Sequence, residues 1–327
     1  MTGRTHPRVT VLGAGAVGGW LAAGLARAGL PVSVLARGAT LAALRADGLV
    51  LLQDDGQEVF RLAASDDPRA LPVADVLLLG LKGHDLPGAL PLIQRLLGPE
   101  TVLLAVQNGL PWWFLQGFGG PAEGMVLEAV DPGGALARAL PATRVLGGVA
   151  HVASRLEAPG VVRLVKQDRM LFGDPTGRHA MLLQALVTAF RQGGLPAEAV
   201  PDIRMEIWLK LWGNSNMNPL SALCHADIAA MLDDDGVRGL VLAMMREMAA
   251  IGTRIGLPIA QDVGERIAVT RRLGAFRTSM LQDLEAGRPL ETGPLIGCLV
   301  ELAAHCGVPV PTIAGVHGLL RLLTRAT

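Results

Sequence analysis

Short apolar runs alternate with segments of helical composition through the first part of the chain. Residues 76–81 and 102–106 are almost continuously apolar, with glycine, proline or polar residues at their borders. Strands of this kind are typical of a parallel sheet that helices cover on both faces. The elements expected up to residue 109 are strand 8–12, a helix within 13–29, strand 31–37, helix 38–48, a hairpin over 49–62 that turns at Asp55–Gly56, strand 73–82, helix 86–98 and strand 101–109.

The pattern changes twice after residue 109. Antiparallel additions to the sheet are expected first, and strand signals stop after Pro201. The elements expected up to residue 200 are strands 145–154, 160–165 and 169–174, helix 178–194 and strand 195–200. The helices expected afterwards are 204–222, 237–256, 261–273, 278–286, 294–306 and 312–325. The sequence therefore predicts an α/β fold, with a doubly wound sheet in residues 1–200 followed by an all-α domain in residues 201–327.

A glycine-rich loop joins the first strand to the first helix. The stretch VTVLGAGAVGGWL matches G-x-G-x-x-G, and its position between a strand and a helix is typical of a Rossmann-type dinucleotide site. The first glycine permits a tight turn, the second lets a pyrophosphate approach, and the third lets helix and strand pack closely. The alternative is a turn that binds no ligand. The residues expected to hold the cofactor here are Gly13, Ala14, Gly15, Ala16, Val17 and Gly18.

The second strand ends at Arg37, where a fold that prefers NAD usually places an acidic residue. Residues 31–46 contain no acid. An arginine in this place suits the 2′-phosphate of NADP, so NADPH is the expected cofactor. The alternative is that Arg37 is a solvated surface charge.

Composition narrows the function classes. The chain has 327 residues, half of them hydrophobic, with 29 basic and 29 acidic side chains. This balance argues against a nucleic-acid or anionic-membrane partner. Three cysteines without paired spacing predict neither a disulfide framework nor a metal site. No apolar stretch is long enough to span a membrane, and the first ten residues lack the apolar core of a signal peptide, so a cytoplasmic protein is expected.

Lysine is rare in this chain. Of the 29 basic residues, 26 are arginine, and the lysines are Lys82, Lys166 and Lys210. A buried lysine can lose its proton near neutral pH, whereas an arginine cannot. Each lysine therefore marks a candidate site for proton transfer, with chance as the alternative.

The helix expected over 204–222 carries a narrow polar row in apolar surroundings. Lys210, Asn214 and Asn218 lie within about 80° of arc. Hydride transfer to a ketone develops negative charge on the carbonyl oxygen, and a lysine ammonium can both stabilise that charge and donate a proton. The row is therefore interpreted as facing a cleft, with a solvated helix face as the alternative. Pro219 is expected to bend or end the helix nearby.

Several separated motifs resemble the ketopantoate reductase (2-dehydropantoate 2-reductase) family. They are GAGAVGG, GLKGHD, VQNGL, EAPGVV, KLWGNSNMNPLSAL and SMLQDLEAGRPLE, in that order. The resemblance implies NADPH-dependent reduction of 2-dehydropantoate to pantoate, a step of pantothenate biosynthesis. It also implies a Rossmann domain followed by a helical domain like that of 6-phosphogluconate dehydrogenase, with the active site in the cleft between them.

The same resemblance assigns roles to individual residues. Lys210 is implied as the general acid and Glu291 as the carboxylate that binds the substrate hydroxyl. Read without the resemblance, Ser279 is a helix cap and Glu291 a surface acid. The implied substrate-binding residues are Asn108, Asn214, Asn218 and Ser279, and the implied cofactor-side residues are Lys82 and Asn108.

The chain also departs from the family pattern. Trp112 and Trp113 follow the VQNGL motif, and Gly293 stands where an acid is expected. The tryptophans either reshape the substrate pocket or serve packing or a homodimer contact. Three hypotheses stay open: a ketopantoate reductase, a reductase of another 2-keto acid or related ketone with the same machinery, and a non-catalytic protein that binds or senses NADP.

Overall fold

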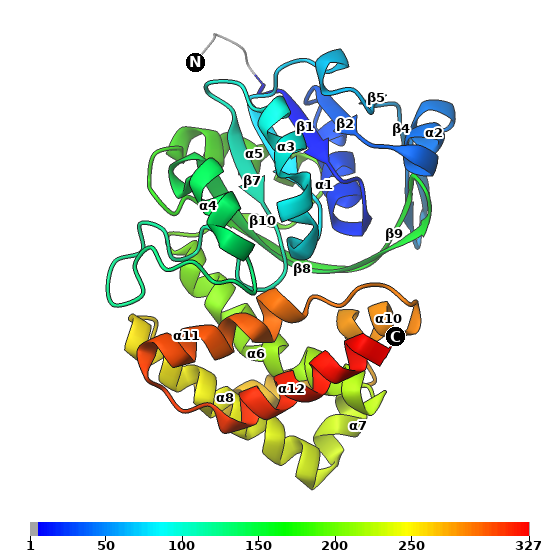
Figure 1. Ribbon diagram of the computed structural model, residues 1–327. Helices are drawn as coiled ribbons and strands as arrows, with labels where there is room; N and C mark the ends of the chain where they lie inside the picture. The colour runs from blue at the N-terminus through cyan, green and yellow to red at the C-terminus, as the bar shows by residue number, and fades with distance from the viewer. Residues whose placement is uncertain (1–5, 327) are drawn as a thin grey trace. The chain divides into compact units, whose positions relative to one another are not determined.

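The contacts of the chain divide it into two compact units. The computed structural model describes residues 6–326, so part of the stretch considered for a signal peptide lies outside it (Figure 1). The sheet unit comprises the chain up to Gln107 together with Arg138–Arg204. The helical unit comprises Asn108–Ala137 together with the chain from Met205 onward. The division differs from the single boundary expected near Pro201, because a segment that directly follows a sheet strand belongs to the helical unit.

The sheet unit contains a Rossmann-type sheet of ten strands. Its strands are β1 (Val9–Leu12), β2 (Val32–Leu35), β3 (Leu49–Gln53), β4 (Gly56–Phe60), β5 (Ala63–Ser65), β6 (Val76–Leu79), β7 (Val102–Ala105), β8 (Val145–Ala158), β9 (Val161–Gly173) and β10 (Ala197–Ala199). The order β5-β2-β1-β6-β7-β8 is parallel throughout and has the doubly wound arrangement that the sequence predicts. The strand order reverses beside β1, so its carboxyl end is where such folds bind ligands.

Two antiparallel pairs extend this sheet. The expected hairpin is present as β3 and β4, but Gln53 pairs with Gly56, which places the turn at Asp54–Asp55. The two strands expected within 160–174 form one continuous strand, β9, which pairs along β8 (Figure 1). Lys166, Gln167 and Asp168, which separate the two expected strands, are exposed residues of β9, and the β8–β9 pair contains three register shifts. β3 and β10 add to β9 in parallel.

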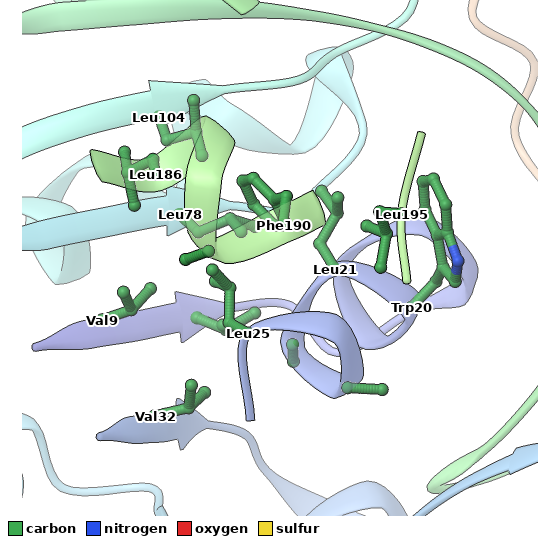
Figure 2. Packing of buried hydrophobic residues seen from close by; sticks show 14 of the residues in the cluster. Val9, Trp20, Leu21, Leu25, Val32, Leu78, Leu104, Leu186, Phe190 and Leu195 are labelled. Carbon is green, nitrogen blue, oxygen red and sulfur yellow. The ribbon is translucent and has the colours of Figure 1, made fainter. Parts of the chain in front are cut away.

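Helices α1 and α5 share the main core of the sheet unit. The helices of this unit are α1 (Ala16–Arg27), α2 (Gly38–Ala46), α3 (Leu86–Leu96) and α5 (Ala180–Gln192), with 3₁₀ turns η1 (Pro68–Ala70), η2 (Gly83–Asp85) and η4 (Ala142–Arg144). Leu21 of α1 lies beside Phe190 of α5, and Trp20 of α1 lies beside Leu195 (Figure 2). The C-terminal end of α5 lies close to α1. A Cβ on Gly193 would lie 1.9 Å from the carbonyl oxygen of Gly24, so only glycine fits at position 193. Burying each large apolar side chain contributes about 1.5–3 kcal/mol.

The helical unit contains all six helices expected after Pro201. Its helices are α4 (Ala135–Ala139), which runs across the unit boundary, α6 (Ile203–Cys224), α7 (Ile228–Asp233), α8 (Asp235–Ile255), α9 (Val263–Arg271), α10 (Ser279–Glu285), α11 (Cys298–Cys306) and α12 (Pro311–Ala326), with the 3₁₀ turn η3 (Pro132–Gly134) and the π-helical turn η5 (Gly293–Gly297). Helix α7, which the sequence did not predict, begins where the Asp227 side chain accepts a hydrogen bond from the backbone of Ala230.

Helix α6 is largely buried within the helical unit. The Trp212 indole donates a 2.9 Å hydrogen bond to the backbone oxygen of Met245 on α8, and Trp208 is fully buried. Pro219 does not end the helix, which continues to Cys224. Within residues 6–326, no helix combines the length and the apolar character needed to cross a membrane.

Candidate functional site

Three glycines pack the first turn of the sheet unit against a neighbouring strand. Gly13 follows β1 with a φ of 92°, and a Cβ on Gly18 would lie 2.1 Å from the Gly13 oxygen. A Cβ on Gly80, directly after β6, would lie 2.3 Å from that same oxygen. Gly80 was not among the residues predicted from the sequence, although a glycine that closes a buried apolar strand signals such an approach.

Gly15 has a different environment from its neighbours in the loop. A Cβ on Gly15 would have no heavy atom within 4 Å, so this side of the loop is open. Gly15 is the N-cap of α1, where no side chain caps the helix and the first turn holds no acidic residue. The open side and the helix N-terminus together fit a pyrophosphate, which needs close backbone approach and N–H donors.

Arg37 and Lys82 lie at the carboxyl ends of the two strands that flank β1. Arg37 follows β2, is exposed, and is the N-cap residue of α2. Lys82 follows β6 and is partly buried. Because β2, β1 and β6 are parallel neighbours, the fold brings the glycine loop and both basic residues to one edge of the sheet.

The helical unit brings four of the sequence-predicted site residues together in two pairs. The Asn214 side-chain nitrogen donates to the Asn108 side-chain oxygen over 3.1 Å. The Asn218 side-chain nitrogen donates to the Ser279 hydroxyl over 3.4 Å. Asn218 is buried, and Asn214 is partly buried. The polar row of α6 is therefore not a solvated face, since both amides bind side chains from distant parts of the sequence.

Lys210 is the charged member of this row. Burial lowers the pKa of Lys210 to about 8, and the negative charge of Glu291 partly opposes this effect. Glu291 is itself buried, with 8% of its surface exposed. The ammonium and the carboxylate therefore influence each other within the helical unit, and Lys210 can exchange its proton near neutral pH.

Asn216 shows that a buried amide on α6 need not belong to the row. It is fully buried, and its side-chain nitrogen donates to the backbone oxygen of Trp212, one turn earlier. This bond is local and serves the helix itself. Partners, rather than burial alone, distinguish Asn214 and Asn218 from Asn216.

The backbone just after Glu291 forms a π-helical turn that packs against Ala129. The π-helical turn η5 begins two residues later, and a Cβ on Gly293 would lie 2.0 Å from the backbone oxygen of Ala129. An acidic side chain, which the family pattern led us to expect, has no room at this position. Single π-helical turns are frequent at functional sites.

Trp112 and Trp113 are packing residues of the helical unit. Trp113 is fully buried and Trp112 is 6% exposed. Trp112 lines a small hollow together with Met125 and Leu127. The next residue, Phe114, places its ring 6.3 Å from that of Trp208 on α6. Their burial agrees with the packing interpretation of the two tryptophans.

Arg266 on α9 is a further cation beside α6 that the sequence analysis did not identify. Its Nη2 would lie 3.1 Å from a Cβ on Gly213, the residue before Asn214. A side chain at position 213 would press against this guanidinium, and no sequence motif signals the contact. Among residues 6–326, no group of three His, Cys, Asp or Glu side chains is placed to hold a metal ion.

Two models of known protein families match this chain. The family model for ketopantoate reductase PanE/ApbA matches residues 9–112. The model for the ketopantoate reductase PanE/ApbA C terminal matches residues 202–324. The two matches cover the glycine loop and the row on α6.

Individual relatives cover almost the whole chain. A 2-dehydropantoate 2-reductase from Mesorhizobium japonicum is 43% identical over 317 residues, which is 97% of each chain. A crystal structure of a candidate ketopantoate reductase from Ralstonia solanacearum MolK2 has a TM-score of 0.93 at 43% identity and covers 98% of each chain. A ternary structure of D-mandelate dehydrogenase with NADH and anilino(oxo)acetate shares the fold, with a TM-score of 0.82 at 20% identity, over 98% of this chain and 99% of that one. The chain therefore belongs to the ketopantoate reductase family and is an oxidoreductase that acts on a small keto acid.

Proposed function

We propose that the protein reduces 2-dehydropantoate to pantoate with NADPH, and that Lys210 is the general acid. The observation that carries this proposal is a lysine on a buried helix, with a pKa near 8, under the influence of the buried Glu291 carboxylate. A proton donor with a pKa close to the working pH is effective in general acid catalysis. The proposal includes a role in pantothenate biosynthesis, which follows from the substrate.

The chemistry divides between the cofactor and the chain. NADPH, when bound, supplies the hydride that the keto carbon receives. Lys210 donates the proton that the keto oxygen needs, and the resulting neutral amine regains a proton from water. Its positive charge also stabilises the developing negative charge on that oxygen before the proton moves.

The other polar groups orient the substrate in this proposal. Glu291 accepts a hydrogen bond from the substrate hydroxyl, and Ser279 contacts the substrate carboxylate. Asn214 and Asn218 donate to substrate oxygens without adding charge to the site. Their amides are held by Asn108 and Ser279, so little side-chain entropy remains to be lost on binding.

The sheet unit supports the choice of a dinucleotide with a 2′-phosphate. The open side of Gly15 leaves space for the pyrophosphate, and the N-terminus of α1 offers backbone donors. Arg37 follows β2, at the position that distinguishes the two nicotinamide cofactors. Lys82 adds a second positive charge at the same edge of the sheet.

A panel of 2-keto acids assayed with NADPH and with NADH tests the proposal. Oxidation of NADPH with ketopantoate, faster than with other keto acids and faster than with NADH, is the expected result. Turnover restricted to another keto acid would replace the substrate but keep the machinery. Binding of NADPH without turnover on the whole panel would contradict the catalytic proposal. Growth of a pantothenate auxotroph that lacks its own ketopantoate reductase tests the pathway role.

A further inference from the structure

Two segments of the helical unit that carry site residues are joined by backbone contacts. Asn108 precedes Gly109, and Glu291 precedes the π-helical turn η5. The backbone nitrogen of Leu110 donates a 2.9 Å hydrogen bond to the backbone oxygen of Pro294 in that turn. Gly109 has a φ of 82°, and a Cβ there would lie 2.5 Å from the same oxygen. The contact therefore requires glycine and fixes Asn108 relative to η5.

Ala129 makes a second contact with the same turn. Its backbone oxygen occupies the space that a side chain on Gly293 would need, and its own Cβ would lie 3.1 Å from a Cβ on Gly297. Its backbone nitrogen donates a 2.8 Å hydrogen bond to the Glu301 Oε1 on α11. The residue is thus held between a turn and a carboxylate that lie in one stretch of chain.

Glu301 is placed to fix the position of η5 and the start of α11. It lies in the first turn of α11, which continues directly from η5. A carboxylate forms a stronger hydrogen bond with a backbone N–H than a neutral acceptor does. Holding Ala129 therefore restricts how far η5 can move from the 108–137 segment, and Glu291 lies just ahead of η5.

We propose that Glu301 is a positioning residue that, by binding the backbone of Ala129, holds Glu291 and Asn108 in the arrangement that the reaction uses. This inference rests on the proposed function, in which Glu291 binds the substrate hydroxyl and Asn108 holds the amide of Asn214. Glu301 acts through the backbone and touches no reacting atom. Loss of its carboxylate loosens Glu291, which weakens both substrate binding and the electrostatic support of the Lys210 ammonium.

Three variants separate this role from a general loss of stability. Glu301→Ala removes the acceptor, whereas Glu301→Gln keeps an oxygen that can bind the Ala129 nitrogen. Glu247→Ala is the matched control, because Glu247 also binds backbone nitrogens of another segment, those of Thr312 and Ile313, over 2.9 and 2.8 Å. Thermal unfolding of each variant measures the common structural cost.

Steady-state kinetics provide the first measurement. Glu301→Ala is expected to raise the KM for ketopantoate about fivefold or more and to leave the KM for NADPH close to that of the wild type. Glu301→Gln should recover most of the loss, and Glu247→Ala should not change the KM for ketopantoate. Equal KM values in Glu301→Ala and the wild type would overturn the inference, as would a failure of Glu301→Gln to recover.

The pKa of Lys210 provides a measurement that needs neither cofactor nor turnover. The chain has only three lysines, so NMR of lysine labelled at Cε resolves them, and Lys210→Arg assigns the signal. The pKa of Lys210 should be lower in Glu301→Ala than in the wild type and unchanged in Glu301→Gln and Glu247→Ala. An unchanged pKa in Glu301→Ala contradicts the positioning role, whereas a wild type inactive on every keto acid contradicts the proposed function instead.

Gly297→Ala keeps the inference testable if Glu301→Ala does not fold. The added methyl would meet the Ala129 side chain at 3.1 Å and shift the same contact from the opposite side. A lower pKa of Lys210 and a higher KM for ketopantoate are expected again. Wild-type values of both in folded Gly297→Ala would overturn the inference.

Discussion

The side chain of Asn214 on α6 donates a 3.1 Å hydrogen bond to the side chain of Asn108, which stands 106 positions earlier in the sequence. Asn214→Asp should break this bond and place two oxygens face to face, at a cost of about 1–3 kcal/mol in stability. Asn108→Asp should cost less, because it keeps an oxygen that can accept from Asn214. Thermal unfolding of both variants gives the comparison, and equal losses would contradict the assigned direction of the bond.

Removal of the proposed proton donor should act mainly on turnover. Lys210→Ala is expected to lower kcat about a hundredfold or more, because the proton is transferred in the transition state. Lys166→Ala, an exposed lysine on β9, is the control and should leave kcat unchanged. A kcat of Lys210→Ala close to the wild type would remove Lys210 from the mechanism.

The pH dependence of the reaction should report the protonation of Lys210. The general acid acts only while protonated, so kcat/KM should fall as pH rises through about 8. Glu291→Gln removes the negative charge that favours the ammonium, which should move this fall to lower pH. A profile measured with both proteins decides the point, and a fall that stays in place or moves upward in Glu291→Gln would contradict the coupling.

The sequence indicates most of the elements because the signals that mark them are local. The apolar runs of β1, β6 and β7, the glycine loop and the helices after Pro201 depend on residues that are neighbours in the chain. The return of residues 108–137 to the helical unit depends on Gly293 and Gly109, whose tight contacts form only after distant segments meet. No periodicity marks such a contact.

The candidate site shows the same division between local and distant information. The spacing of Lys210, Asn214 and Asn218 indicates a row on one helix, and the structure adds Asn108 and Ser279 as the partners of its amides. Glu291 reads as an ordinary surface acid from its own neighbours, and only the family resemblance draws attention to it. Its burial results from packing across the helical unit.

Cofactor preference should depend on Arg37. Arg37→Asp is expected to raise the KM for NADPH about tenfold or more and to affect the KM for NADH far less, because only NADPH carries the 2′-phosphate. Arg45→Ala, on the exposed side of α2, is the control. Equal changes for the two cofactors would exclude the 2′-phosphate role of Arg37.

Two glycines of the loop should respond differently to alanine. Gly15→Ala has open space around the new methyl, so the protein should keep its melting temperature but lose most of its affinity for NADPH. Gly18→Ala would place the methyl 2.1 Å from the Gly13 oxygen, so it should lower the melting temperature even without cofactor. Thermal unfolding with and without NADPH distinguishes the two, and a similar loss of stability in both would contradict the assigned roles.

The chain passes between its two units after residues 107, 137 and 204. A gene fragment that starts at residue 205 encodes most of the helical unit. It omits Asn108, Ala129 and the buried Trp112 and Trp113, which complete the packing of that unit. Chimeras built from two relatives therefore need three junctions to exchange a whole unit, and a single junction near residue 200 would combine a 108–137 segment from one parent with its packing partners from the other. Among relatives, substitutions in the 108–137 segment should therefore covary with substitutions around Gly293 and Glu301, although more than 150 residues separate the two regions.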